Sequence, residues 1–287
     1  MGRRIKIGEC ILTKKIICAF EAYLQREEKS ANTIGKYLRD ARSFALFCAD
    51  IIVTKEVVVA YKEHLINGGY SVRSVNSMLA SLNSLFSFLN WTEFRVKSVK
   101  VQRTVYYPRE KELTREEYMR LADTARKKGN TRLNLLLQTI CGTGIRVSEL
   151  QFITVEAVRR GEVSVSLKGK TRTVFIVRAL RKKLLSYAAE QGIKSGAIFI
   201  TRTGRPVSRT NIWREMKGIC AQSNVNPAKV FPHNLRRLFA RVFYSLEKDI
   251  AKLADILGHS SINTTRIYII STGAEHRRQM ENMRLII

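Results

Sequence analysis

The chain has 287 residues, 45% of them hydrophobic and only 4 of them proline, a composition typical of folded proteins rather than disordered ones. It carries 51 Lys and Arg against 24 Asp and Glu, so its formal net charge is +27 at pH 7. A charge of this size favours a polyanionic partner, most often nucleic acid, although ribosomal and membrane-surface proteins are also basic.

The cysteines and the apolar runs exclude several classes of protein. The five cysteines are widely spaced and contain no CxxC pair or Cys/His cluster, so we expect neither a zinc site nor a disulfide framework. No apolar run is long enough to span a membrane, and the first twenty residues contain no signal-peptide pattern. We therefore expect a cytoplasmic, nucleoid-associated protein with no membrane partner and no cofactor.

Four stretches with helical spacing of apolar residues occupy the beginning of the chain, at 14–25, 30–49, 54–69 and 71–90. The second has a cap at Ser30 or Asn32, and the third ends on Gly68 and Gly69, a stop signal. This pattern predicts a small all-helical domain over residues 1–97.

Basic residues mark the candidate DNA contacts of this first domain. Lys36, Arg39 and Arg42 lie on the polar side of the second helix, where they either contact a DNA backbone or form an ordinary solvated face. Residues 98–112 then lose helical periodicity, are rich in cations and contain Pro108, which predicts a basic linker.

A second domain, expected over 113–272, mixes helices with one hairpin. Thr114 and Glu117 fit a capping box, and helical patterns follow at 131–144, 208–222, 232–246, 249–259 and 261–271, with a further helical turn from Arg146. Residues 162–177 alternate like two strands around the turn "KGKT". The tail, residues 273–287, ends in the amphipathic pattern Met280, Met283, Ile287.

Four motifs occur in a fixed order in the second domain: "GTGIRVSEL" at 142–150, a lysine at the hairpin tip, "HNLRR" at 233–237 and "LGHSSINTTRIY" at 257–268. Together they resemble the tyrosine recombinases, the phage-integrase-like site-specific DNA recombinases. The resemblance covers nearly the whole chain. It implies a helical core-binding domain and a mixed α/β catalytic domain that form a C-shaped clamp on DNA. It also implies cleavage and rejoining of DNA through a 3′-phosphotyrosyl intermediate, with no metal or nucleotide.

The resemblance places Arg146 and Arg236 at the family's two arginine positions. Attack on a phosphodiester builds charge on the non-bridging oxygens, and a planar, permanently cationic guanidinium can hold them with two hydrogen bonds. Glu149, one turn after Arg146, either orients that arginine or is a surface helix residue. The position after Arg236 is often histidine in the family, and here Arg237 is either a third phosphate contact or a neutral replacement.

Three further residues match catalytic positions of the family. Tyr268 matches the nucleophile, and a phenol with a pKa near 10 needs help to lose its proton. His233, three residues before Arg236, matches the position of acid–base assistance, and His259 matches a hydrogen-bond donor to the scissile phosphate.

The hairpin tip supplies the expected general acid, which protonates the leaving 5′-oxygen. The "KG" pattern favours Lys168, although Lys170 is an alternative. Lys170 and Arg172 are also expected to contact DNA.

The predicted partners are double-stranded DNA and further copies of the chain. The family implies a tetramer on synapsed DNA, with a monomer or weak oligomer in isolation, and accessory DNA-bending or directionality factors are possible partners. The tail either docks into a neighbouring protomer or packs on its own domain. We expect integration or excision of a mobile element, or resolution of DNA. A type IB topoisomerase and a catalytically silent DNA-binding regulator on the same fold are the competing readings.

Overall fold

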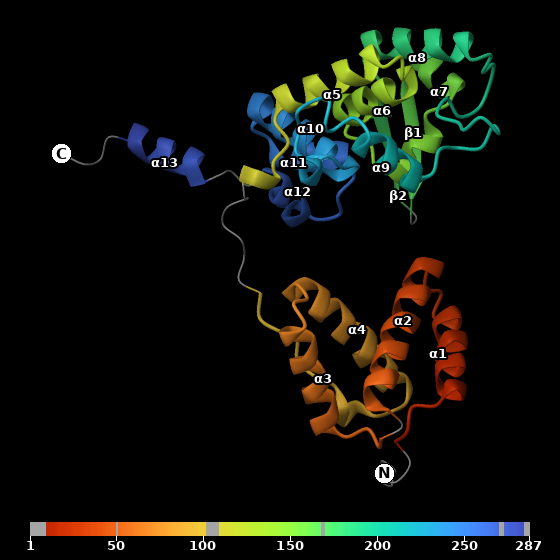
Figure 1. Cartoon of the computed structure of the whole chain (residues 1–287), viewed down its shortest axis with the longest axis vertical. Coiled ribbons are helices and arrows are strands. Elements are labelled where there is room, and N and C mark those ends of the chain that lie inside the picture. Colours follow the sequence, from red (N-terminus) through yellow and green to blue (C-terminus); the bar gives the residue numbers. More distant parts are fainter. Residues whose placement is uncertain (1–9, 50, 102–108, 168–169, 270–272, 284–287) are drawn as a thin grey trace. The chain divides into compact units, whose positions relative to one another are not determined.

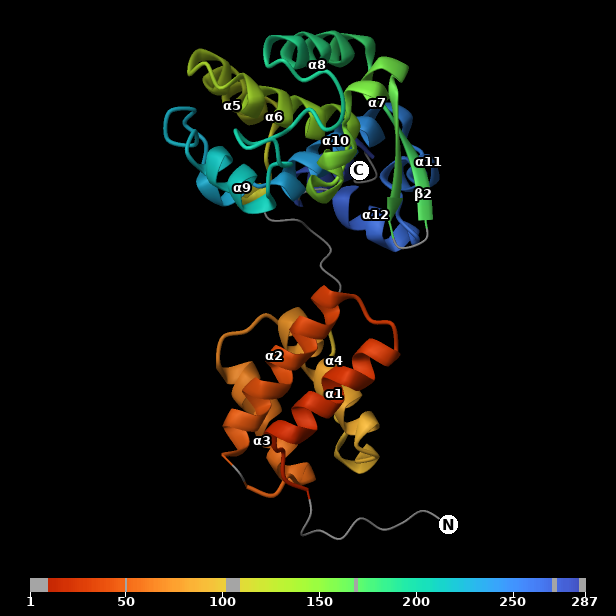
Figure 2. The ribbon, with the colours of Figure 1, turned by 90° about the vertical axis from the view of Figure 1, so that its right-hand side faces the viewer.

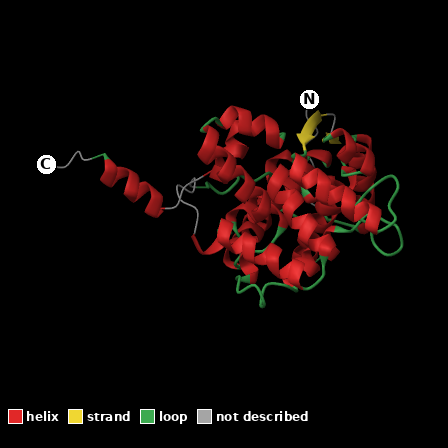
Figure 3. Cartoon of the chain, turned by 90° about the horizontal axis from the view of Figure 1, so that it is seen from above, coloured by secondary structure: helices red, strands yellow, loops and turns green. Residues whose placement is uncertain are grey.

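The computed structural model describes residues 10–49, 51–101, 109–167, 170–269 and 273–283. It divides into two compact units, Met1–Arg103 and Thr104–Ile287. Figure 3 shows that helices dominate. The described residues contain one two-stranded sheet. The predicted fold class, mainly helical with a small hairpin, is therefore confirmed.

The first unit is an all-helical bundle (Figure 1), as its apolar periodicity predicts. Each helix begins behind a hydroxyl side chain that accepts a backbone N–H of the first turn, and Ser30 rather than Asn32 caps the second helix. The core centres on the unexposed side chains of Phe20, Phe44 and Phe86. The elements are α1 (Lys14–Arg26), α2 (Ala31–Cys48), α3 (Lys55–Asn67), α4 (Val72–Phe88) and the 3₁₀ turn η2 (Thr92–Phe94).

The second unit is built around α6, which packs against α5, α8 and α10 and is buried on several faces (Figure 1). The capping box at Thr114 and Glu117 is present at the start of α5. The elements are η3 (Arg109–Lys111), α5 (Arg115–Lys127), α6 (Thr131–Thr143), η4 (Val147–Phe152), α7 (Val155–Arg160), β1 (Glu162–Leu167), β2 (Lys170–Phe175), α8 (Arg178–Glu190), α9 (Arg209–Lys217), η5 (Pro227–Lys229), α10 (Pro232–Glu247), α11 (Ile250–Leu257), α12 (Ile262–Ile269) and α13 (Gly273–Asn282).

Strands β1 and β2 form the antiparallel hairpin predicted from the alternation of apolar residues (Figure 2). In its register Val163 pairs with Val174 and Val165 pairs with Arg172, and paired residues point to the same face of the sheet. The three valines are buried against the core of the unit. Arg172 therefore shares the inward face of the hairpin.

Two helices in the second unit were not predicted from the sequence. Helix α7 has only six residues, too few for a periodic pattern, and α8 begins after Val177, which makes no side-chain cap. A small second hydrophobic cluster lies apart from the main core and joins α10, α11 and α12 through Ala240, Leu253, Leu257 and Tyr268. No helix among the described residues is long and apolar enough to cross a membrane.

Candidate active site

Two helices that lead into the candidate site each end at a glycine, one in the motif "GTG" and one in the motif "LGH". Gly144 ends α6 and Gly258 ends α11, both with a φ of +63°. A Cβ on Gly144 would clash with the ring of Phe239, and one on Gly258 would clash with the side chain of Arg172. Only glycine fits either position, because the left-handed backbone and the close neighbours both exclude a side chain.

The carbonyls at these two helix ends hold the two arginines. Arg236 donates from Nη1 to the carbonyl of Gly144 and from Nη2 to the carbonyl of Leu257 at 2.6 Å. Arg146 donates from Nη2 to the carbonyl of Gly258 at 3.0 Å. The last carbonyls of a helix have no partner within it and carry its negative dipole end, so they suit a guanidinium.

A buried carboxylate orients Arg146 from the other side. Glu149 is fully buried, and its Oε1 accepts from Arg146 Nη1 at 2.8 Å while Oε2 accepts from the Arg146 backbone N–H at 2.9 Å. Burial opposes ionisation of Glu149, but these hydrogen bonds and the nearby charges outweigh it and lower its pKa. Glu149 is thus a charged partner of Arg146, and its interpretation as a surface residue is wrong.

Arg172, which the sequence analysis expects to contact DNA, is a second partner of Glu149. Its Nη2 donates to Glu149 Oε2 at 2.5 Å, and its Nη1 donates to the Ile256 carbonyl at 2.7 Å. Only 11% of its side chain is exposed. The reason is the alternation of β2, which turns Arg172 inward beside Val174.

Arg236 is deeply buried, with 2% of its surface exposed. Burial and the charge of Arg146 lower its pKa to about 10, so it remains a cation at neutral pH. The adjacent Arg237 is 5% exposed and belongs to the same helix, α10. Two adjacent positive charges are thus held largely away from water at the start of α10.

His259 lies against Arg236. Its Nε2 is 3.1 Å from Arg236 Nη2, and its Nδ1 is 2.9 Å from the hydroxyl of Thr265, which is fully buried. Desolvation and the charges of Arg236 and Arg146 lower its pKa to about 4. The ring is therefore neutral at pH 7 in the free protein.

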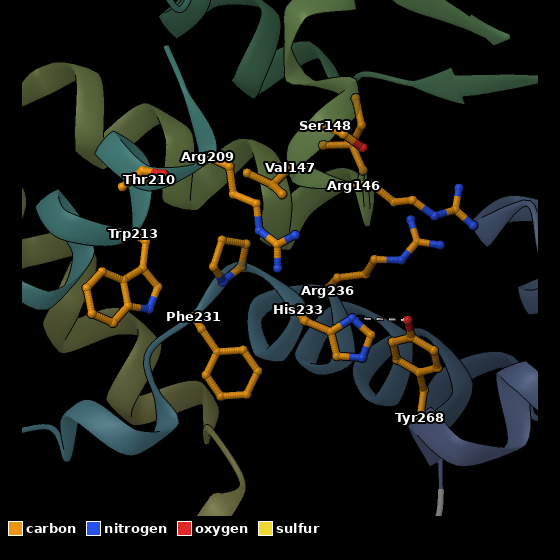
Figure 4. Close-up of a pocket in the computed structure, with 12 residues that line it drawn as sticks. Arg146, Val147, Ser148, Arg209, Thr210, Trp213, Phe231, His233, Arg236 and Tyr268 are labelled. Atoms are coloured by element: carbon orange, nitrogen blue, oxygen red, sulfur yellow. Dashed lines mark hydrogen bonds between the residues drawn. The ribbon is translucent and has the colours of Figure 1, made fainter. Parts of the chain in front are cut away.

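Tyr268, on α12, points its hydroxyl at His233 on α10 (Figure 4), and 3.4 Å separates the hydroxyl from Nδ1. Desolvation, followed by the charges of Arg236 and Arg237, lowers the pKa of His233. A neutral His233 can accept a proton from the phenol, which is the arrangement general-base assistance requires. Tyr268 is 7% exposed and its ring also contacts His259, with 5.2 Å between ring centroids.

The side chains of Arg146, His233, Arg236 and Tyr268 line a cavity of about 560 Å³ in the second unit (Figure 4). One wall comes from α9, whose Arg209, Thr210 and Trp213 were not singled out in the sequence. Their signal is weak, because an arginine after the Ser208 cap resembles any basic helix start. The lining residues are Ile145, Arg146, Val147, Ser148, Arg209, Thr210, Trp213, Phe231, Pro232, His233, Arg236 and Tyr268.

Comparison with known protein families identifies the family of this chain. The model of the Phage integrase family matches residues 111–275, and that of the phage integrase N-terminal SAM-like domain matches residues 17–93. The chain belongs to the phage integrase family. It is a tyrosine recombinase, an enzyme that breaks and rejoins DNA.

Named relatives resemble this recombinase along most of its length. It is 30% identical to tyrosine recombinase XerA of Thermococcus kodakarensis, over 95% of this chain and 96% of that one. It is 28% identical to XerA of Pyrococcus furiosus, over 97% of both chains, and 28% identical to XerD of Staphylococcus aureus, over 88% and 92%.

Solved structures share the fold of the recombinase. A lambda integrase dimer bound to a COC′ core site matches with a TM-score of 0.74 at 17% identity, over 92% of this chain and 96% of that one. XerH bound to difH in a pre-cleavage complex matches with a TM-score of 0.68 at 18% identity, over 95% and 90%.

The remaining predicted residues of the recombinase are not among the residues that line this cavity, or they lie outside the described residues. Lys168 lies outside the described residues, and Lys170 is the first residue of β2. In the first unit Arg39 and Arg42 are exposed on α2, whereas Lys36 forms an ion pair with Asp40 at 2.7 Å and donates to Ser81 at 2.8 Å. Among the described residues of the recombinase, no group of three or more His, Cys, Asp or Glu could hold a metal ion.

Proposed function

We propose that this recombinase is a site-specific enzyme that cleaves and rejoins double-stranded DNA through a 3′-phosphotyrosyl intermediate on Tyr268. The observation that carries the proposal is the hydroxyl of Tyr268 beside His233, at the edge of a cavity that Arg146 and Arg236 enter. The DNA complexes among the solved structures of similar fold support a DNA substrate.

The two arginines would receive the scissile phosphate. A guanidinium has five N–H donors, and the bonds to Gly144, Leu257, Gly258 and Glu149 use only some of them. Those bonds fix each guanidinium plane before DNA arrives, so charge that develops on the phosphate meets donors already in place. His259, in contact with Arg236, is the third proposed phosphate ligand.

Proton transfer completes the chemistry. The oxygen of Tyr268 attacks phosphorus while its proton passes to His233, the bond from phosphorus to the 5′-oxygen breaks, and Lys168 gives that oxygen a proton. The phosphotyrosine keeps the energy of the broken bond, so rejoining reverses the same step. No step in this scheme needs a metal or a nucleotide.

The rest of the chain would position DNA for this chemistry. We assign residues 1–97 to core binding through Arg39 and Arg42, residues 98–112 to a basic linker, and 113–272 to catalysis. The exposed Met280 and Met283 of the tail, residues 273–287, would dock into a neighbouring protomer of a DNA-bound tetramer. A mobile element or a chromosomal repeat would supply the site, and accessory DNA-bending factors would act on it in the cytoplasm.

Covalent trapping tests the proposal directly. The protein is incubated with nicked suicide duplexes from DNA flanking its own gene, beside a Tyr268→Phe variant. A denaturant-resistant adduct that requires Tyr268 supports the proposal, and mapping the adduct locates the site. Specific binding without an adduct would indicate a silent regulator, and relaxation of arbitrary supercoiled DNA would indicate a topoisomerase.

A further inference from the structure

Thr265 is a buried polar residue of the site to which the proposed chemistry gives no role. It lies on α12, three residues before Tyr268, so both side chains occupy neighbouring positions on one side of the helix. Its side chain is fully buried, and its hydroxyl is 2.9 Å from Nδ1 of His259. Helix α12 thus carries both Tyr268 and Thr265, the hydrogen-bond partner of His259.

The hydrogen-bond roles around His259 follow from the chemistry of its neighbours. Nη2 of Arg236, 3.1 Å from Nε2 of His259, can only donate, because a guanidinium has no acceptor. Nε2 must therefore accept and carries no proton. A neutral imidazole then has its proton on Nδ1, which donates to the Thr265 hydroxyl.

The surroundings of His259 favour this neutral ring. The charged and titratable groups that face it are Arg236 and His233 from α10, Arg146 before η4, Arg172 from β2 and Tyr268 from α12. Three of these are permanent cations, so a second proton on the ring is disfavoured until a negative charge arrives. A phosphate oxygen would bring that charge, and it accepts but never donates a hydrogen bond.

We propose that Thr265 is a positioning residue that holds His259 as its Nδ1–H tautomer, and that a phosphate entering beside Arg236 binds to His259 only as Nε2 gains a proton. The bond from Nδ1 to Thr265 is the same in the neutral and the protonated ring. The ring therefore keeps its orientation while its Nε2 changes from acceptor to donor. The second half of this proposal rests on the proposed function, because it requires DNA phosphate at the site.

Nitrogen-15 spectra of histidine-labelled protein test the tautomer without any need for activity. The chain has only 4 histidines, and a His259→Gln sample assigns the signals of His259. Free protein at pH 7 should show a protonated Nδ1 and a bare Nε2. Thr265→Val should give the other tautomer or a mixture, Thr265→Ser should restore the first, and Thr264→Val, at the exposed neighbouring position, should change nothing. A wild-type ring protonated on Nε2 alone would overturn the assignment of Thr265.

The proton uptake is tested on the complex with uncleaved DNA. Tyr268→Phe protein bound to its recombination site should show protons on both nitrogens of His259, and an unprotonated Nε2 in that complex would refute the proton uptake.

In the cleaving protein, Thr265→Val should slow adduct formation about tenfold, the effect of one lost hydrogen bond, with DNA affinity unchanged. Thr265→Ser should restore the rate and its pH profile, and a Ser variant as slow as Val would contradict positioning through the hydroxyl. If wild-type protein forms no adduct, the proposed function fails while the tautomer result still stands.

Discussion

Glu149 and Arg172 come from separate elements of the second unit and meet as a buried ion pair, with 2.5 Å between Oε2 and Nη2. Because Glu149 also binds Arg146, one carboxylate joins the hairpin strand β2 to an arginine of the candidate active site. Its negative charge offsets two positive charges that would otherwise repel each other at close range.

Replacement of Glu149 by Gln should destabilise the second unit by about 3 kcal/mol, because the largely buried Arg172 and the partly exposed Arg146 lose their counter-charge. Urea unfolding monitored by Trp213 fluorescence, in a Trp91→Phe background, measures the change in the second unit. Glu247→Gln is the control, since its exposed ion pair with Lys252 should contribute less than about 1 kcal/mol. Equal losses of unfolding free energy in Glu149→Gln and Glu247→Gln would contradict the conclusion that the charge of Glu149 is buried.

His233→Gln should lower the rate of adduct formation by about a hundredfold or more at pH 7, the usual contribution of a general base. The amide can still accept a hydrogen bond from Tyr268 but cannot take its proton. Single-turnover cleavage of a suicide duplex provides the rate. A variant that forms the adduct as fast as the wild-type protein would argue against His233 as the base.

Gly144→Ala should destabilise the second unit by about 3 kcal/mol, because overpacking against Phe239 adds to the strain of a left-handed backbone. Gly192→Ala is the matched control: it has a similar φ of +68° but open space around the added Cβ, so only about 1 kcal/mol of backbone strain applies. DNA cleavage should also fall in Gly144→Ala, since the Gly144 carbonyl holds Arg236. Identical melting temperatures for the two variants would exclude the clash.

Stability should decrease as pH falls from about 6.5 toward about 4, because the pKa of His259 drops from 6.5 to about 4 on folding. In that interval the unfolded chain binds more protons than the folded one, so acid favours unfolding. The lowered pKa of His233 acts in the same direction. Urea denaturation across this range measures the slope, and His259→Gln should make it shallower. An unchanged slope in that variant would show that His259 titrates normally in the folded protein.

The local elements of the fold were predictable because their signals lie close together in the sequence. Hydroxyl caps, the box of Thr114 and Glu117, and the alternation around the hairpin each involve neighbouring residues. Helix α8 was not predicted, because Val177, the residue before its first turn, provides no side-chain cap. The inward position of Arg172 was implicit in its register with Val165, yet its charge suggested an exposed residue.

The candidate site was predictable in its residue types but not in its contacts. The motifs identify Arg146, Arg236 and Tyr268, and the structure brings these three into one cavity. The main-chain carbonyls that hold the arginines have no side-chain signature, and neither does the wall formed by α9. Such contacts depend on where helices end in space, which residue spacing alone does not determine.

The small cluster that joins α10, α11 and α12 gives the second unit unequal local stability. Tyr268 is buried in this cluster rather than in the main core around α6. Because few apolar side chains hold it, opening of this cluster should cost less free energy than unfolding of the whole unit. Backbone amides of α11 and α12 should then exchange their hydrogens sooner than those of α6. The helix that carries Tyr268, the proposed nucleophile, should therefore be able to separate from its neighbours while the rest of the unit stays folded.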